Sequence, residues 1–228
     1  MLEADKNQVA IIDYGMGNLF NVQRACASAG LRGAITSDKD TIMRSSGIIL
    51  PGVGAFGDAI GNLKKLDLIG LIRDQIDQQK PFLGICLGMQ LLLTESEEFG
   101  RHEGLDIIKG RVVKFNNMEQ KNPMIKVPQV GWNQIFFRNV QGAHEDLVLQ
   151  SISDGEYMYF VHSFYAVPQD DAVIVTRTWY EGIKYCSSLS KGSVFATQFH
   201  PEKSGLEGLK ILKNWASKVN EYEGMIKK

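Results

Sequence analysis

Three short apolar runs near the start of the chain are each followed by a glycine-containing turn and a segment with helical spacing. They read QVAIIDY (8–14), GIILP (47–51) and PFLGI (81–85). Strands that alternate with helices in this way are typical of a mostly parallel sheet that helices cover on both faces. This half of the sequence therefore predicts an α/β fold.

The second half of the chain has a different pattern, with few helical segments between its apolar runs. Strand-like runs cover residues 110–115, 133–137, 157–167, 172–178, 183–189 and 193–199, and an amphipathic helix is expected at 205–222. Short strands in succession indicate additional, partly antiparallel strands attached to the parallel core. No repeat or linker interrupts the chain, so we expect one domain over residues 1–228.

Composition narrows the classes of function. The 228 residues carry a formal net charge of −1, which argues against a general attraction to nucleic acid or to membranes. The polar N-terminus does not read as a signal peptide, and the apolar runs are too short to span a bilayer. Cys26, Cys86 and Cys186 are too widely separated for a disulfide framework or a paired metal site. We expect a cytoplasmic protein without metal or organic cofactor, in which Cys26 and Cys186 are structural.

Cys86 stands between two glycines, where the run PFLGI meets a segment with helical spacing, LGMQLLLTESEE (87–98). The pattern Gly84-x-Cys86-x-Gly88 is the cysteine version of the nucleophile elbow, a sharp strand-to-helix turn whose glycines leave no Cβ in the way. The helix that follows would favour a thiolate and offer the amide of Leu87 to an oxyanion. The alternative is an inert cysteine in an apolar turn.

A thiol needs a base, and the chain has four histidines. His102 and His144 lie among polar loop residues and are expected to be solvated. His162 ends a strand-like run and is either a core histidine or a site residue. His200 follows the run VFATQF, and Glu202 two residues later could fix its tautomer. The alternative is a surface His–Glu pair; together with the elbow, the pair predicts a Cys-His-Glu triad.

A second glycine-rich turn follows the run GIILP, where Gly52 and Gly54 flank Val53. A backbone with this freedom could turn an amide toward the thiolate and complete an oxyanion hole. The alternative is an ordinary tight loop between strand and helix, in which glycine and proline are common. Taken alone, these residues favour the ordinary loop.

The motifs PGVGAFGDA, GICLGMQLL, VPQVGWN, YFVHSFY and TQFHPEKSG occur in this order along the chain. In this combination the sequence closely resembles the glutaminase subunits of imidazole glycerol phosphate synthase, within the class I (triad) glutamine amidotransferase family. The resemblance runs from IIDYGMGN to the last helix. It implies a flavodoxin-like α/β fold with a mostly parallel sheet, helices on both faces and extra antiparallel strands.

The resemblance also implies roles for individual residues. The nucleophile, the base and its orienting partner are Cys86, His200 and Glu202. The amino acid moiety of glutamine is held by Gln90, Glu98, His162, Ser163 and Phe164. The strand whose amide completes the oxyanion hole contains Gly52, Val53 and Gly54, and the face toward the partner subunit contains Trp132, Tyr159 and Lys203.

The implied reaction is hydrolysis of glutamine to glutamate and ammonia in histidine biosynthesis. The ammonia would pass into a (β/α)8 barrel cyclase that forms a heterodimer with this chain. Loss of one oxyanion donor typically lowers a rate by about 10²–10³-fold. A loop at 51–54 that misplaces one amide could therefore keep the enzyme idle until ligand on the barrel corrects it.

The chain departs from the family at Gln129-Val130, where a His-Met pair commonly precedes Gly-Trp-Asn. This departure puts partner contact or signalling in doubt, but not hydrolysis. The segment GIKYCSSLSKGSVFATQF also resembles a paralogous branch that supplies ammonia to a sugar amidotransferase in surface-polysaccharide synthesis. A free-standing cysteine hydrolase and a catalytically silent interaction subunit are the remaining alternatives.

Overall fold

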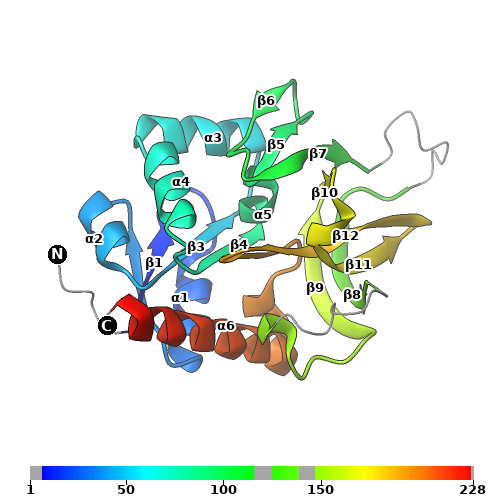
Figure 1. Cartoon of the computed structure of the whole chain (residues 1–228). Helices are drawn as coiled ribbons and strands as arrows, with labels where there is room; N and C mark the ends of the chain where they lie inside the picture. Colours follow the sequence, from blue (N-terminus) through cyan, green and yellow to red (C-terminus); the bar gives the residue numbers. More distant parts are fainter. Residues whose placement is uncertain (1–6, 116–124, 139–146, 227–228) are drawn as a thin grey trace.

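The computed structural model describes residues 7–115, 125–138 and 147–226, which form two sheets with helices around the larger one (Figure 1). The nine-stranded sheet contains β1 (Gln8–Ile12), β2 (Arg32–Thr36), β3 (Gly47–Gly52), β4 (Phe82–Cys86), β8 (Gln129–Phe137), β9 (Glu156–His162), β11 (Ile174–Tyr180), β12 (Ile183–Lys191) and β13 (Val194–Thr197). The four-stranded sheet contains β5 (Leu93–Ser96), β6 (His102–Glu103), β7 (Ile108–Lys114) and β10 (Phe164–Pro168). The α-helices are α1 (Leu19–Ser28), α2 (Lys39–Arg44), α3 (Phe56–Lys65), α4 (Ile69–Asp77), α5 (Leu87–Leu91) and α6 (Gly205–Ile226).

The parallel half of the larger sheet has the strand order β2-β1-β3-β4-β13. This order is the flavodoxin-like one, in which ligands bind outside the carboxyl ends of the strands. The observed architecture confirms the predicted α/β fold with a mostly parallel core. The remaining strands, β12, β11, β8 and β9, continue the sheet in antiparallel pairs, as the second half of the sequence predicts.

Side chains alternate across the parallel strands and build a separate core on each face of the sheet. Val9 and Ile11 of β1 pack on the side of α1 and α6, whereas Ala10 and Ile12 pack on the side of α2, α3 and α4. Because both faces are covered, these strands are apolar at almost every position. In Figure 1, α6 runs below the sheet and α3 lies above it.

Two sequence-based boundaries are wrong. The helix expected at 87–98 ends at Leu91, because the next residues form β5 and pair with β6 and β7. The run at 157–167 is two strands rather than one, since the chain leaves the larger sheet after His162 and enters the smaller one at Phe164. Pairing with other strands, which the spacing within each segment does not show, decides both boundaries.

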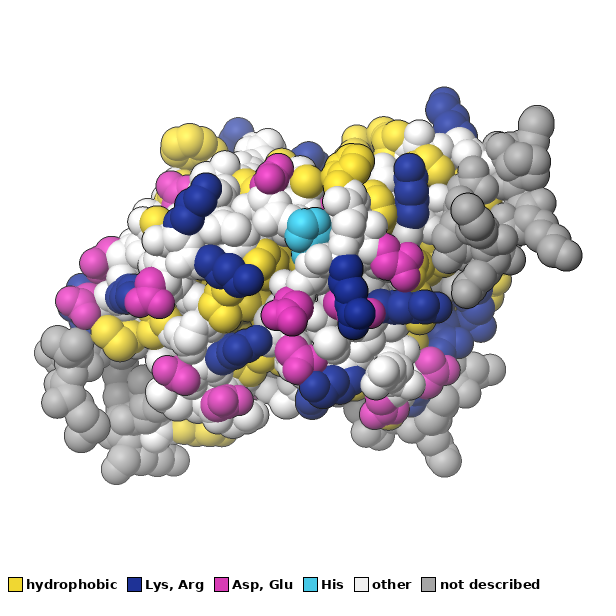
Figure 2. All heavy atoms as spheres, turned by 90° about the horizontal axis from the view of Figure 1, so that it is seen from above, with side chains coloured by type: hydrophobic (Ala, Val, Ile, Leu, Met, Phe, Trp, Pro, Cys, Tyr) yellow, Lys and Arg dark blue, Asp and Glu magenta, His cyan; other side chains and the backbone are white. Residues whose placement is uncertain are grey.

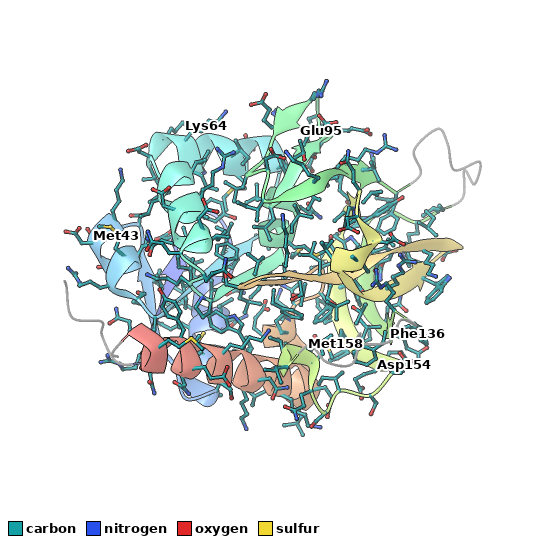
Figure 3. All side chains as sticks on the ribbon, in the orientation of Figure 1. Met43, Lys64, Glu95, Phe136, Asp154 and Met158 are labelled. Carbon is teal, nitrogen blue, oxygen red and sulfur yellow. The ribbon has the colours of Figure 1, made fainter. Side chains whose placement is uncertain are left out.

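The face of the molecule that carries α3 mixes charges of both signs. Figure 2 shows lysines and arginines interspersed with aspartates and glutamates on the face above α3, without a large area of one sign. Met43 and Lys64 point outward at the periphery, and Met158 of β9 is buried on the side of α6 (Figure 3). Among the helices of the described residues, none is both long and apolar enough to cross a bilayer.

Candidate functional site

The turn after β4 has the geometry of a nucleophile elbow. Cys86 lies between strand and helix with φ 53° and ψ −107°, a conformation that costs energy for any residue other than glycine. A Cβ on Gly88 would lie 1.7 Å from the carbonyl oxygen of Leu50, and one on Gly84 would lie 3.1 Å from the Cβ of Ala196. The predicted reason for the glycines, a lack of space for a Cβ, is confirmed at Gly88, whereas at Gly84 the space is tight.

His200 and Glu202 form a buried pair just beyond β13. The Nδ1 atom of His200 lies 2.8 Å from Oε1 of Glu202, and both side chains are almost fully buried. This contact fixes the imidazole orientation and leaves Nε2 as the ring nitrogen that Glu202 does not bind. The alternative of a solvated surface pair is therefore wrong.

The sulfur of Cys86 and the imidazole of His200 interact electrostatically. Burial alone would lower the pKa of His200, but negative charge on Cys86 and then on Glu202 reverses this effect, and the net pKa is raised. A raised imidazole pKa favours the imidazolium beside a thiolate. The three predicted triad residues thus meet at the carboxyl edge of the parallel sheet.

A cavity of about 270 Å³ opens beside the sulfur. Its lining includes every predicted substrate-binding residue: Gln90, Glu98, His162, Ser163 and Phe164. Its lining comes from both sheets, because Cys86 ends β4 of the larger sheet and Glu98 follows β5 of the smaller one. The volume suits a ligand smaller than a typical drug molecule.

Glu98 is the acidic group of this cavity. Its Oε2 accepts a hydrogen bond of 2.6 Å from the backbone N–H of Phe56, the first residue of α3. Burial raises the pKa of the Glu98 carboxyl, and the Phe56 N–H and nearby His102 only partly offset this effect. A carboxylate with this desolvation cost gains from a cationic partner, such as an α-ammonium group.

His162 forms part of the opposite wall and is neutral. Its Nδ1 atom lies 2.8 Å from the carbonyl oxygen of Phe164, and burial lowers the pKa of the imidazole to about 3. The ring packs against Phe115 and Tyr185, at centroid distances of 5.2 and 5.3 Å. Phe115 also contacts Tyr185 at 5.4 Å, so these rings join the two sheets behind the cavity.

The turn after β3 lies beside the elbow. Gly52 is in register with Cys86, and a Cβ on Gly52 would lie 2.3 Å from the hydroxyl of Tyr14. This hydroxyl donates a hydrogen bond of 2.7 Å to the carbonyl of Pro51. Val53 and Gly54 line the cavity, and Gly54 has φ +108°. The turn is therefore adjacent to the sulfur, as an oxyanion strand requires.

The three residues expected at a partner interface form one cluster. The rings of Trp132 and Tyr159 meet edge to face at 6.1 Å, and Nζ of Lys203 lies 5.8 Å from the centre of the Tyr159 ring. Trp132 is 56% exposed, which is unusual for so large an apolar side chain. The carbonyl of Tyr159 accepts a hydrogen bond from the backbone N–H of His200, so the cluster directly adjoins the triad.

Cys26, Cys186 and His102 do not line the cavity, although the charge of His102 acts on the Glu98 carboxyl. His102 is half-buried in β6 rather than fully solvated, with its ring against Gly57, and His144 lies outside the described residues. Cys26 and Cys186 are buried free thiols, in agreement with the structural role predicted for them. No cluster of metal-ligating side chains occurs among the described residues.

Sequence reasoning missed Gln198. This residue is fully buried, and its Nε2 lies 3.6 Å from the sulfur of Cys86. A signal was present, because Gln198 continues the alternation of Val194 and Ala196 and is therefore a polar residue in an apolar series. Buried carboxamides require hydrogen-bond partners, so such a residue is a reason to search for a polar site.

Comparison with known proteins agrees with this geometry. The sequence profile described as "Glutamine amidotransferase class-I" matches residues 10–219. The chain belongs to the class-I glutamine amidotransferase family. As in the other members of the family, this amidotransferase is an enzyme, and the predicted family resemblance is confirmed.

The relatives of this class-I glutamine amidotransferase include named subunits. "Imidazole glycerol phosphate synthase subunit HisH" of Syntrophotalea carbinolica is 45% identical over 91% of this chain and 98% of its own length. The subunit of the same name from Aquifex aeolicus is 43% identical over 94% of this chain and 98% of its own length.

Solved structures at lower identity share the fold. PurLQS from Thermotoga maritima matches with a TM-score of 0.67 at 20% identity, over 94% of this chain and 98% of that chain. The glutaminase domain of Trypanosoma brucei CTPS matches with a TM-score of 0.64 at 15% identity, over 94% of both chains. These likenesses support the class-I amidotransferase fold and nothing finer.

Proposed function

We propose that this class-I glutamine amidotransferase is the glutaminase subunit of an imidazole glycerol phosphate synthase in histidine biosynthesis. One observation carries the reaction: a buried His200–Glu202 pair interacts with Cys86, which lines a cavity of about 270 Å³. The similarity to subunits named HisH supports the pathway. We take residues 1–228 as one glutaminase domain, which works in the cytoplasm, where three free thiols persist.

In the first half of the reaction the Cys86 thiolate attacks the side-chain amide carbon of glutamine. A C–S bond forms, and the negative charge moves to the amide oxygen. The N–H of Leu87 and an amide of the turn after β3 would stabilise this oxyanion. The C–N bond then breaks, and His200 gives its proton to the departing nitrogen, which leaves as ammonia.

In the second half, water attacks the γ-glutamyl thioester. Neutral His200 takes a proton from this water, and Glu202 stabilises the imidazolium that forms. The C–S bond breaks, glutamate leaves, and the sulfur returns to the thiolate. Throughout, Glu98 holds the substrate ammonium, and Gln90, His162, Ser163 and Phe164 enclose the rest of the amino acid.

The partner in this proposal is a (β/α)8 barrel cyclase. The exposed Trp132 with Tyr159 and Lys203 would form part of the contact, next to the triad through the Tyr159–His200 backbone bond. Ammonia would then leave toward the barrel rather than into solvent. The turn at 51–54 would respond to ligand on the barrel and complete the oxyanion hole.

Reconstitution tests the proposal. The chain is purified with a barrel cyclase from the same organism, and glutamate release and cyclase product are measured with glutamine or with ammonium chloride. We expect Cys86→Ala to lower glutamine-dependent turnover by at least about 10⁴-fold and to leave ammonia-dependent product formation unchanged. Cys186→Ala, at a buried thiol whose charged neighbours are Arg177 and Asp171, is the matched control and should stay within about threefold of wild type.

Glutamine-dependent product from the Cys86→Ala complex would contradict the mechanism. Ammonia transfer to a surface-sugar acceptor, but not to the histidine-pathway nucleotide, would instead support the paralogous branch. Comparable turnover of the free chain with and without the liganded barrel would contradict the switch at 51–54.

A further inference from the structure

Gln198 connects two residues of the site. It follows β13 two residues before His200, and its side chain is fully buried. Its Nε2 lies 3.6 Å from Sγ of Cys86, and its Oε1 accepts a hydrogen bond of 3.1 Å from Nε2 of Gln90. Both ends of the carboxamide therefore contact groups of the proposed catalytic site.

The carbonyl oxygen of Phe164 determines the orientation of the Gln198 carboxamide through Gln90. The carbonyl oxygen of Phe164 can only accept, so the Gln90 group at 2.8 Å from it must be the NH₂. The same Gln90 NH₂ also meets Gln198, which must therefore present its oxygen there. Gln198 is then left with its own NH₂ toward the sulfur. The sequence of contacts is Phe164 C=O, Gln90, Gln198 and Cys86.

The backbone carbonyl of Val161 also lies near the sulfur, but it is a hydrogen-bond acceptor, whereas the Gln198 NH₂ is a donor. The carbonyl oxygen of Val161 lies 3.8 Å from Sγ, and a thiol can donate to it. A thiolate has no proton to donate, so this carbonyl opposes its formation. A donated N–H from Gln198 stabilises the thiolate instead, because hydrogen bonds to ionised groups are the stronger ones.

Packing alone does not account for a glutamine at this position. Its neighbours along the strand on the same side, Val194 and Ala196, are apolar. An apolar side chain of similar volume would fill the space without the cost of burying a carboxamide. That cost is offset only by the contacts with Cys86 and Gln90, and both lead to the site.

We propose that Gln198 is a further catalytic residue, whose carboxamide N–H binds the Cys86 sulfur and stabilises the thiolate in an orientation that Phe164 and Gln90 impose. This inference rests on the proposed role of Cys86 as nucleophile. It adds a donor that is already in place before glutamine binds, in contrast to the oxyanion donors, which act only after attack.

Alkylation of Cys86 by iodoacetamide tests the donor without substrate. The rate is measured from pH 5 to 10 on the full chain, with the modified peptide identified by mass spectrometry. Burial raises the pKa of Cys26 to about 12 and also raises the pKa of Cys186, so neither thiol competes near neutral pH.

The variants are Gln198→Met, which keeps the volume and removes the donor, and Gln198→Glu, which replaces the donor with a charge. We expect the alkylation profile of Gln198→Met to move up by about one pH unit, a tenfold loss of rate on its rising limb. The alkylation profile of Gln198→Glu should move up by more than that of Gln198→Met. With glutamine and the barrel partner, kcat should fall about tenfold, with KM within about threefold.

Thr197→Val is the matched control. Thr197, the last residue of β13 and the neighbour of Gln198, is equally buried, and its hydroxyl donates to the carbonyl of Phe199 at 2.8 Å rather than to the sulfur. Its alkylation profile should superimpose on wild type even if its melting temperature falls. If Gln198→Met does not fold, the profile of Gln198→Glu decides.

Unchanged alkylation profiles in the folded Gln198 variants would overturn the proposal, as would an equal shift in Thr197→Val. Failure of the proposed function gives a different result, namely glutaminase activity that survives complete alkylation of Cys86. The two failures are therefore distinguishable.

Discussion

The turns after β3 and β4 lie side by side in the parallel sheet, yet they are built in opposite ways. Gly52 and Cys86 are in register, so both turns begin at the same level. The turn after β4 is buried throughout, and Gly88 packs directly on the backbone of Leu50. The turn after β3 reaches the surface, with Val53 42% exposed.

The contrast separates two requirements of the chemistry. The nucleophile needs one fixed position, which the steric contacts of Gly84 and Gly88 impose. The oxyanion donor in our proposal must be able to change position, and an exposed turn with few contacts permits this. Four substitutions test how far the two turns differ.

The largest effect is expected in the buried turn. Gly88→Ala would place a Cβ 1.7 Å from the carbonyl of Leu50, and no side-chain motion relieves a clash with backbone. We expect a loss of at least about 4 kcal/mol of unfolding free energy, or no folded protein. Gly61→Ala in α3, where a Cβ meets nothing within 4 Å, should be neutral or slightly stabilising. Equal denaturant midpoints for the two variants would contradict the rigid elbow.

The next largest effect is expected at His162, which lines the cavity together with Cys86 and Val53. The pKa of His162 is lowered to about 3 in the folded chain and is about 6.5 when unfolded, so below pH 6.5 the unfolded state binds more protons. Stability is therefore lost progressively as the pH falls from 6.5 toward 3. Between pH 7 and 5 this histidine should cost about 2 kcal/mol.

His162→Gln keeps a donor for the Phe164 carbonyl but does not titrate. Urea titrations of wild type and His162→Gln should show that the variant loses about 2 kcal/mol less unfolding free energy than wild type between pH 7 and pH 5. Comparable losses in the two proteins would show that this imidazole is not held neutral.

The exposed turn should respond in activity more than in stability. Gly54→Ala would place alanine at φ +108° and its Cβ 2.5 Å from the terminal carbon of Met16, a flexible side chain that can move. Gly30→Ala is the matched control, because Gly30 also has a positive φ, +83°, but lies at the end of α1 with nothing near its Cβ.

Both variants should lose about 1 kcal/mol of unfolding free energy through the same backbone strain. Only Gly54→Ala should also lower glutaminase turnover in the barrel complex, by at least about tenfold. If the two variants keep equal turnover, the turn after β3 supplies no oxyanion donor.

The smallest effect is expected at the contact that holds the exposed turn in place. Tyr14→Phe removes the hydroxyl that donates to the Pro51 carbonyl and should cost about 1 kcal/mol in thermal or urea unfolding. Tyr157→Phe, at a side chain that is 52% exposed, should cost nothing measurable. A neutral Tyr14→Phe would mean that water replaces the lost donor.

The sequence predicted those features whose causes are local. The glycines around Cys86 and the spacing of His200 and Glu202 operate over a few residues, so the elbow and the His–Glu pair could be expected from the residue pattern alone. The polar Gln198 in an apolar series was a signal of a polar site, but its contact with Cys86, 112 residues away along the chain, could not be predicted from local spacing. The sequence also did not show that the strand ends at Ser163. The strand-like run continues through this residue, but β9 before it and β10 after it pair in different sheets.

The cavity takes its sulfur from the end of a strand in one sheet and Glu98 from the residues after a strand in the other, and the rings of Phe115 and Tyr185, 5.4 Å apart, join these sheets. The distance between the Cys86 sulfur and the Glu98 carboxylate therefore depends on the spacing of the two sheets rather than on any single side chain. Asparagine, shorter than glutamine by one methylene, would fall short at one end, a difference worth about 1–3 kcal/mol. In the proposed function, discrimination by substrate length would therefore depend on the packing of Phe115 against Tyr185, and a ring-to-aliphatic change at either residue would alter it without changing Cys86, His200 or Glu202.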